Sequence, residues 1–104
     1  MARVVSPSAF SGTETVAIAR RLLGMRLVVR APHGDSTHAL CITETEAYDG
    51  PEDKACHASR GVTARTRVLF GPPGHWYVYL CYGIHEMLNL VTGPEGYPAA
   101  VLIR

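Results

Sequence analysis

The sequence predicts a single domain of the mixed α/β (α+β) class, with antiparallel β-strands and a few helices. Its 104 residues are enough for one small domain and too few for two. Hydrophobic residues make up 47% and charged residues 18% of the chain, which excludes a disordered acidic or basic tail. One segment has the apolar spacing of a helix, and several short apolar runs between glycine and proline residues have the composition of strands.

A helix is predicted near the start of the chain, at 14–23. Thr13 can cap its first turn, and Gly24 can end it. Five strands are predicted from the apolar runs, at 27–29, 39–46, 76–82, 87–91 and 99–103. A turn at 32–35 joins the first two strands into a hairpin, and Gly83 turns the third strand toward the fourth.

The last predicted strand, 99–103, is apolar at every position, which is typical of a strand that is covered on both faces. Little other sequence in the chain is left to cover its second face. We therefore expect residues 1–104 to be the N-terminal portion of a larger, truncated domain, with the C-terminal half missing.

Cellular location and redox state also follow from the composition. No apolar run approaches the ~20 residues that a membrane span needs, and the N-terminus lacks the apolar core of a signal peptide. These observations predict a cytoplasmic protein with no membrane partner. Cys41, Cys56 and Cys81 are an odd set without metal-ligand spacing, so we expect reduced thiols and no metal.

The basic residues are mostly arginine. The net charge of +1 does not by itself indicate a nucleic-acid partner, but nine of the ten basic residues are Arg. Arg60, Arg65 and Arg67 fall within eight positions and are called the arginine loop below. Because Arg binds phosphate in a bidentate manner, this loop is a candidate anion-binding site. The alternative is a solvated loop with scattered charges.

A pair of carboxylates precedes a tyrosine in the second predicted strand. Side chains alternate along a strand, so Glu44, Glu46 and Tyr48 share one face. Two carboxylates that are desolvated together raise the pKa of at least one of them. A carboxylate tuned in this way, beside an aromatic ring, suits general-base catalysis on a ring-bearing substrate. The alternative is an exposed strand face with scattered polar groups.

The strands at 76–82 and 87–91 carry aromatic and amide side chains. Tyr77 and Tyr79 share one face, and Tyr82 precedes the turn at Gly83, where an aromatic ring can act as a wedge between stacked bases. The alternative is that these tyrosines fill a small core. Asn89 is a polar residue in an apolar strand, so it either satisfies a structural hydrogen bond or faces a polar ligand.

Together these motifs resemble the alkyladenine (3-methyladenine) DNA glycosylase family, also called methylpurine-DNA glycosylase. The resemblance runs from about residue 9 to the end of the chain. Eight pieces follow one another in the family's order, at 19–24, 43–48, 50–53 with His57, 60–63, 70–74, 77–83, Asn89 and 101–104. The resemblance implies a monofunctional enzyme that flips alkylated or deaminated purines out of duplex DNA. It also implies hydrolysis of the N-glycosidic bond without a metal or an organic cofactor.

The resemblance assigns a role to each matching residue. It implies that Glu46 activates the attacking water and that Arg104 lies beside this carboxylate. It implies a pocket for the flipped purine lined by Tyr48, His57, Tyr79 and Asn89. Within that pocket, Asn89 would crowd the 2-amino group of guanine and disfavour the undamaged base.

The expected partner is damaged double-stranded DNA. Tyr82 would fill the gap that the flipped base leaves, and the arginine loop would contact the DNA backbone. No obligate protein partner is expected, and the protein would be a monomer, associated with the nucleoid if it is bacterial. Two other interpretations stay open. One is a truncated, catalytically silent DNA-binding remnant of the same family, and the other is a small metal or redox domain using Cys56, His57 and Cys81.

Overall fold

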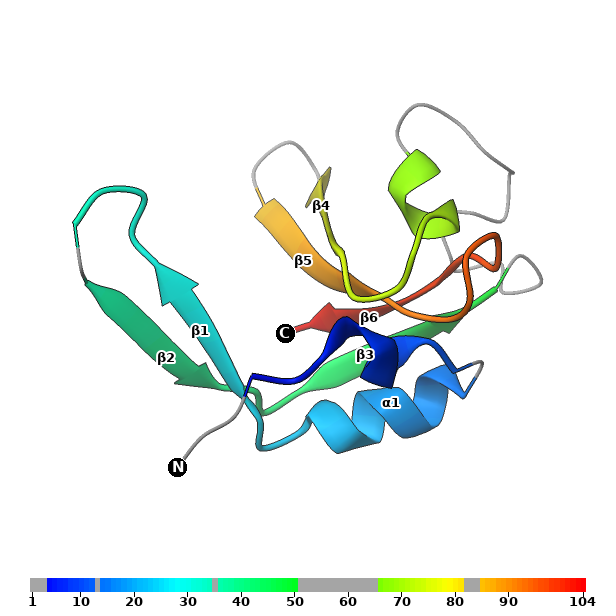
Figure 1. Ribbon diagram of the computed structural model, residues 1–104, viewed down its shortest axis with the longest axis horizontal. Helices are drawn as coiled ribbons and strands as arrows, with labels where there is room; N and C mark the ends of the chain where they lie inside the picture. The colour runs from blue at the N-terminus through cyan, green and yellow to red at the C-terminus, as the bar shows by residue number, and fades with distance from the viewer. Residues whose placement is uncertain (1–3, 13, 35, 51–65, 82–84) are drawn as a thin grey trace.

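The computed structural model describes residues 4–12, 14–34, 36–50, 66–81 and 85–104, without the side chains of Leu80 and Cys81. Over these ranges the chain forms one α-helix and six strands, which make two antiparallel sheets (Figure 1). The predicted mixed α+β fold with antiparallel strands is therefore confirmed. None of the helices in this part of the chain is long and apolar enough to cross a membrane.

The helix α1, Thr15–Leu22, lies within the predicted range. It follows a short 3₁₀ helix, η1, at Pro7–Phe10. Its buried side chains include Ile18, Ala19 and Leu22, which lie on one face because a helix turns every 3.6 residues. Gly24 has a φ of 86°, the left-handed conformation that ends many helices. Thr13, the expected cap, lies outside the described residues.

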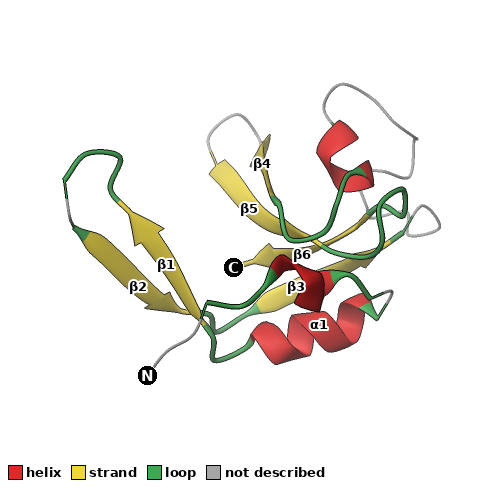
Figure 2. Ribbon diagram, viewed as in Figure 1, coloured by secondary structure: helices red, strands yellow, loops and turns green. Residues whose placement is uncertain are grey.

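The strands β1, Arg26–Arg30, and β2, Thr37–Cys41, form a two-stranded sheet that projects from the rest of the molecule (Figure 2). Because this sheet has only two strands, even apolar side chains such as Val28 and Leu40 stay 59% and 58% exposed. The prediction of one returning strand at 39–46 is wrong. The chain leaves β2 at Ile42, whose backbone is hydrogen-bonded to Gly24 and Met25, and its next strand belongs to the other sheet.

The larger sheet has four antiparallel strands in the order β3-β6-β5-β4. Their bounds are Thr45–Asp49 for β3, Trp76–Cys81 for β4, His85–Val91 for β5 and Ala99–Ile103 for β6. The last three match the predicted strands at 76–82, 87–91 and 99–103 closely. Another 3₁₀ helix, η3, spans Arg67–Phe70 before β4.

Both faces of the larger sheet are covered where the central strand β6 passes. On one face, called the helix face below, Val101 packs with Ile18 and Leu22 of α1. On the opposite face, Ala100 packs with Leu69 of η3 and with neighbouring strand residues. The expectation that the chain leaves the second face of 99–103 uncovered is therefore wrong. The covering segments lie far from β6 in sequence, and β6 is flanked by β3 and β5 instead of forming an edge.

Candidate active site

Several of the predicted site residues share the face of the larger sheet opposite α1. The strand register places Glu46 opposite Leu102, Leu102 opposite Asn89, and Asn89 opposite Tyr77. Directly paired residues point to the same side of a sheet, so these four side chains form a row across the strands. Tyr48 and Tyr79 lie two residues along from this row and point to the same side. We call this side the Glu46 face.

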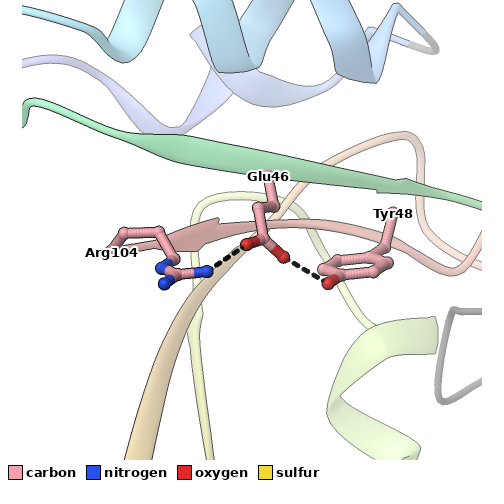
Figure 3. A network of polar contacts seen from close by, with 3 residues as sticks. All are labelled: Glu46, Tyr48 and Arg104. Carbon is pink, nitrogen blue, oxygen red and sulfur yellow. Dashed lines mark hydrogen bonds and ion pairs between the residues drawn. The ribbon is translucent and has the colours of Figure 1, made fainter.

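The carboxylate of Glu46 is held from two directions (Figure 3). The Tyr48 hydroxyl donates a hydrogen bond of 2.5 Å to Glu46 Oε1, and Arg104 Nη1 donates one of 2.5 Å to Glu46 Oε2. Arg104 reaches this position because its backbone N–H donates to the Glu44 carbonyl and continues the pairing of β6 with the chain before β3. The side chains of Arg104 and Glu46 are 51% and 37% exposed, so the cluster is open to solvent.

These two hydrogen bonds determine the charge state of the cluster. The hydrogen bond from Tyr48, followed by that from Arg104, holds the pKa of Glu46 below its ordinary value of 4.5. Partial burial acts in the opposite direction and does not overcome them. The hydrogen bond to Glu46 raises the pKa of Arg104 in turn. Glu46 is therefore a carboxylate, and Arg104 a cation, throughout the neutral range.

The expected carboxylate pair on one strand is not formed. Glu44 precedes β3, whose first residue is Thr45. The expectation of a raised carboxyl pKa is also wrong for Glu46, because a phenol and a guanidinium stabilise its charged form. Glu44 instead supplies a backbone acceptor and a nearby negative charge for Arg104.

Asn89 and the tyrosines of β4 lie farther along the Glu46 face. Asn89 is buried, and its Nδ2 donates a hydrogen bond of 3.3 Å to the Met87 carbonyl. The Asn89 amide is therefore hydrogen-bonded within its own strand, β5. That strand is separated from β3, which carries Glu46, by β6. The ring centroids of Tyr77 and Tyr79 are 5.6 Å apart. Tyr77 is part of the core beside η3, as the core-filling alternative expects, whereas Tyr79 is only partly buried at the edge of that core.

Most of the other predicted site residues belong to parts of the chain that the structure does not describe. His57, Tyr82, Arg60 and Arg65 lie outside the described residues. Arg67, the last member of the arginine loop, is exposed at the start of η3. Cys56 also lies outside, and no group of three His, Cys, Asp or Glu side chains that could hold a metal occurs in the ranges that the structure describes. The structure thus brings together Glu46, Tyr48 and Arg104, with Asn89 and Tyr79 on the same face.

One polar cluster on the helix face was not predicted from the sequence. Asp49, the last residue of β3, accepts hydrogen bonds from Thr15 of α1 and from Tyr97 in the turn between β5 and β6. The alternation of Thr45, Ala47 and Asp49 toward α1 was the available signal. The alternation would have indicated the cluster only with the knowledge that a helix covers this side of the strand.

Comparison with known proteins adds an independent observation. Residues 9–104 match the family model described as Methylpurine-DNA glycosylase (MPG). A relative from Methanocella arvoryzae, named Putative 3-methyladenine DNA glycosylase, is 60% identical over 100 residues, which are 96% of this chain and 49% of the relative. Relatives with the same name come from Anaeromyxobacter dehalogenans strain 2CP-C and Wolbachia pipientis. The Anaeromyxobacter relative is 53% identical over a stretch that covers 94% of this chain and 46% of the relative. The Wolbachia relative is 48% identical over a stretch that covers 100% of this chain and 54% of the relative. The chain spans about half the length of the curated relatives it matches.

Proposed function

The chain belongs to the methylpurine-DNA glycosylase family, and on that premise we propose that its Glu46 face forms part of a site that hydrolyses the N-glycosidic bond of damaged purines in duplex DNA. The relatives are named for 3-methyladenine, so the proposed substrates are alkylated purines of this type, together with deaminated purines. The observation that carries the proposal is the carboxylate of Glu46, held between Tyr48 and Arg104 on a half-exposed sheet face.

Glu46 is the proposed general base. A carboxylate offers about four lone-pair positions on its two oxygens, and each oxygen of Glu46 uses one of them for Tyr48 or Arg104. Each oxygen can therefore accept a further hydrogen bond from a water molecule. Such a water, held by Glu46 and attacking the C1′ carbon of the sugar, would pass its proton to this carboxylate.

The low pKa of Glu46 fits a reaction in which the leaving group departs easily. Purines alkylated at N3 or N7 are cationic, so their bond to the sugar weakens without strong help from a base. The sugar then develops positive charge in an oxocarbenium-like transition state, which a fixed carboxylate stabilises. Arg104 is positively charged and would repel the positive charge that develops on the sugar. We therefore assign Arg104 to orienting Glu46 and the water.

The substrate base must leave the helix to reach this face. The C1′ atom is inaccessible within the base stack, and extruding a nucleotide costs a few kcal/mol, least for a weakened pair. In the proposal, Tyr48 and Tyr79 offer aromatic faces to the flipped base, where stacking and attraction to a cationic purine offset that cost. Asn89 crowds the 2-amino group of guanine. His57 completes the pocket, Tyr82 fills the vacated stack, and the arginine loop contacts the DNA backbone.

The test is release of free base from damaged DNA by the 104-residue chain. A duplex treated with a methylating agent is incubated with the protein, and free 3-methyladenine is measured by chromatography and mass spectrometry. We expect release well above that from heat-inactivated protein, and none of the damaged base from an untreated duplex. Binding to a lesion-containing duplex without any release would instead support a catalytically silent DNA-binding remnant. A chain that neither binds the lesion-containing duplex nor releases base would contradict both functions.

A further inference from the structure

The strand that carries Glu46 is fastened to α1 through its alternate residues. Thr45, Ala47 and Asp49 point to the helix face, whereas Glu46 and Tyr48 point away from it. Near the start of β3, Thr45 Oγ1 donates a hydrogen bond of 3.0 Å to the Ala19 carbonyl of α1. At the other end, Thr15 Oγ1 donates one of 3.2 Å to Asp49 Oδ1. Both ends of the strand are thus tied to the same helix.

Three separate segments meet at the Asp49 carboxylate. Besides Thr15 at the start of α1, the Tyr97 hydroxyl donates a hydrogen bond of 2.9 Å to Asp49 Oδ1 from the turn between β5 and β6. Thr15 is fully buried, and its hydroxyl lies 3.4 Å from that of Thr92, which is also fully buried. Asp49 therefore links the helix, the edge strand and the turn that leads into β6.

Two glycines leave room for this contact. Gly50 and Gly93 have φ values of 81° and 78°, and the Tyr97 side chain lies against both of them. A Cβ atom on Gly50 would come within 2.5 Å of the Tyr97 hydroxyl oxygen, and one on Gly93 within 3.1 Å of Tyr97 Cδ2. A side chain at Gly50 would require Tyr97 or the local backbone to shift. The close fit shows that the Tyr97–Asp49 contact is a built feature of the fold.

The register of β3 decides which side chains reach the Glu46 face. β3 is an edge strand that pairs with β6 alone among the described strands. A shift of one residue in such a pairing turns every side chain to the opposite face, and a smaller displacement would move Glu46 away from Arg104. Contacts on the helix face therefore bear on the geometry of the opposite face.

We propose that Asp49 is a positioning residue for Glu46: held by Thr15 and Tyr97, it fixes β3 so that Glu46 and Tyr48 meet Arg104. The importance of this for catalysis rests on the proposed function, whereas the positioning itself does not. Asp49 is on the far side of the strand and does not contact the substrate.

The decisive experiment follows Glu46 directly. The carbon-13 shift of the Glu46 carboxyl group is titrated by NMR in the wild-type chain, in Asp49→Ala and in Asp49→Asn. We expect Asp49→Ala to move the titration midpoint of Glu46 upward, toward 4.5, because the hydrogen bonds from Tyr48 and Arg104 weaken. Asn keeps an acceptor oxygen for Thr15 and Tyr97, so Asp49→Asn should restore a midpoint near that of the wild type.

Two further variants keep the result interpretable. Ile18→Val removes one buried methyl group from α1 without touching Asp49 and should leave the Glu46 midpoint unchanged, although it also lowers stability. If Asp49→Ala does not fold, Tyr97→Phe removes a single hydroxyl and should move the midpoint in the same direction by a smaller amount. A wild-type midpoint in Asp49→Ala, or in Tyr97→Phe if that variant has to be used, overturns the proposal.

Base release separates this proposal from the proposed function. If the wild-type chain releases 3-methyladenine, Asp49→Ala should lower the single-turnover rate by roughly tenfold or more with little change in binding, since small misplacements of a reacting group are costly. Release by wild type together with an unshifted Glu46 midpoint contradicts the positioning role alone. A shifted midpoint with no release by any protein supports the positioning role and contradicts the function.

Discussion

The two faces of the four-stranded sheet differ in what covers them and in the chemistry that they carry. On the helix face, α1 buries Ile18 and Leu22 against Val101, and the polar groups there bind one another. On the Glu46 face, Leu69 of η3 forms a buried cluster with Tyr77, Val91 and Ala100, while Glu46 and Arg104 remain accessible beside Tyr48. Consecutive residues of β3 therefore serve different purposes. Apart from Asp49, whose proposed role is to position Glu46, changes on the helix face should act mainly on stability, and changes on the Glu46 face mainly on base release.

The largest expected effect is on the Glu46 face. Glu46→Gln keeps the shape of the side chain but cannot accept a proton, so release of 3-methyladenine should fall by roughly a hundredfold or more, the usual contribution of a general base. Binding to lesion DNA should stay close to that of the wild type. Glu44→Gln is the matched control and should be much milder, because Glu44 bonds Arg104 through its backbone carbonyl. The assignment of the base is wrong if Glu44→Gln is the inactive variant.

The next largest effect is on the helix face. Ile18 is 1% exposed, and Ile18→Ala should lower the free energy of unfolding by about 2–5 kcal/mol, measured by urea denaturation. Val16 lies on the same helix but is 54% exposed, so Val16→Ala should change that free energy by no more than about 0.5 kcal/mol. Equal losses in the two variants would mean that α1 does not pack on the sheet through this face.

A smaller effect is expected on the choice of base. Asn89→Ser shortens the side chain two strands from Glu46, and we expect release of undamaged guanine to rise by roughly tenfold, as for other small changes in a pocket. The assay compares guanine with 3-methyladenine released from the same methylated duplex. Because Asn89 also bonds the Met87 carbonyl, unchanged guanine release would leave it with a structural role alone.

The smallest effect concerns acid stability. The pKa of Glu46 is lower in the folded chain than its ordinary value of 4.5, so below that pH the unfolded chain binds more protons at this residue. The stability contributed by Glu46 is therefore complete above 4.5 and is lost as the pH falls through the folded pKa. Urea denaturation of wild type and Glu46→Gln should show a gap in stability that narrows as the pH is lowered from neutral. A gap that widens in acid would contradict the direction of the shift.

The local elements of this fold were predictable, because each depends on residues close together in sequence. The helix and the strands at 87–91 and 99–103 follow from apolar spacing and from glycine at the turns. The break after Cys41 was missed because apolar residues continue through Ile42, whereas the next strand, β3, pairs with β6, which lies far away in sequence. Spacing alone contains no information about such a contact.

The candidate site was predictable in its residue types and not in its geometry. The alternation of Glu46 and Tyr48 placed them on one face, and the family resemblance added Arg104. The raised pKa that was expected for a carboxylate pair is not found at Glu46, because the Tyr48 hydroxyl and Arg104, which is 58 residues away in sequence, hydrogen-bond to its charged form. The cover of β6 and the contacts of Asp49 were not predicted, because both depend on segments distant along the chain.

The most direct test of this account is the titration of Glu46 itself in the wild-type chain, followed through its carboxyl carbon by NMR. The arrangement with Tyr48 and Arg104 predicts a midpoint below 4.5. It also predicts that Tyr48→Phe raises this midpoint, because the Tyr48 hydrogen bond is the largest cause of the shift. A wild-type midpoint at or above 4.5 would contradict the account, since Glu46 would then not be the doubly held carboxylate on which the proposed reaction depends.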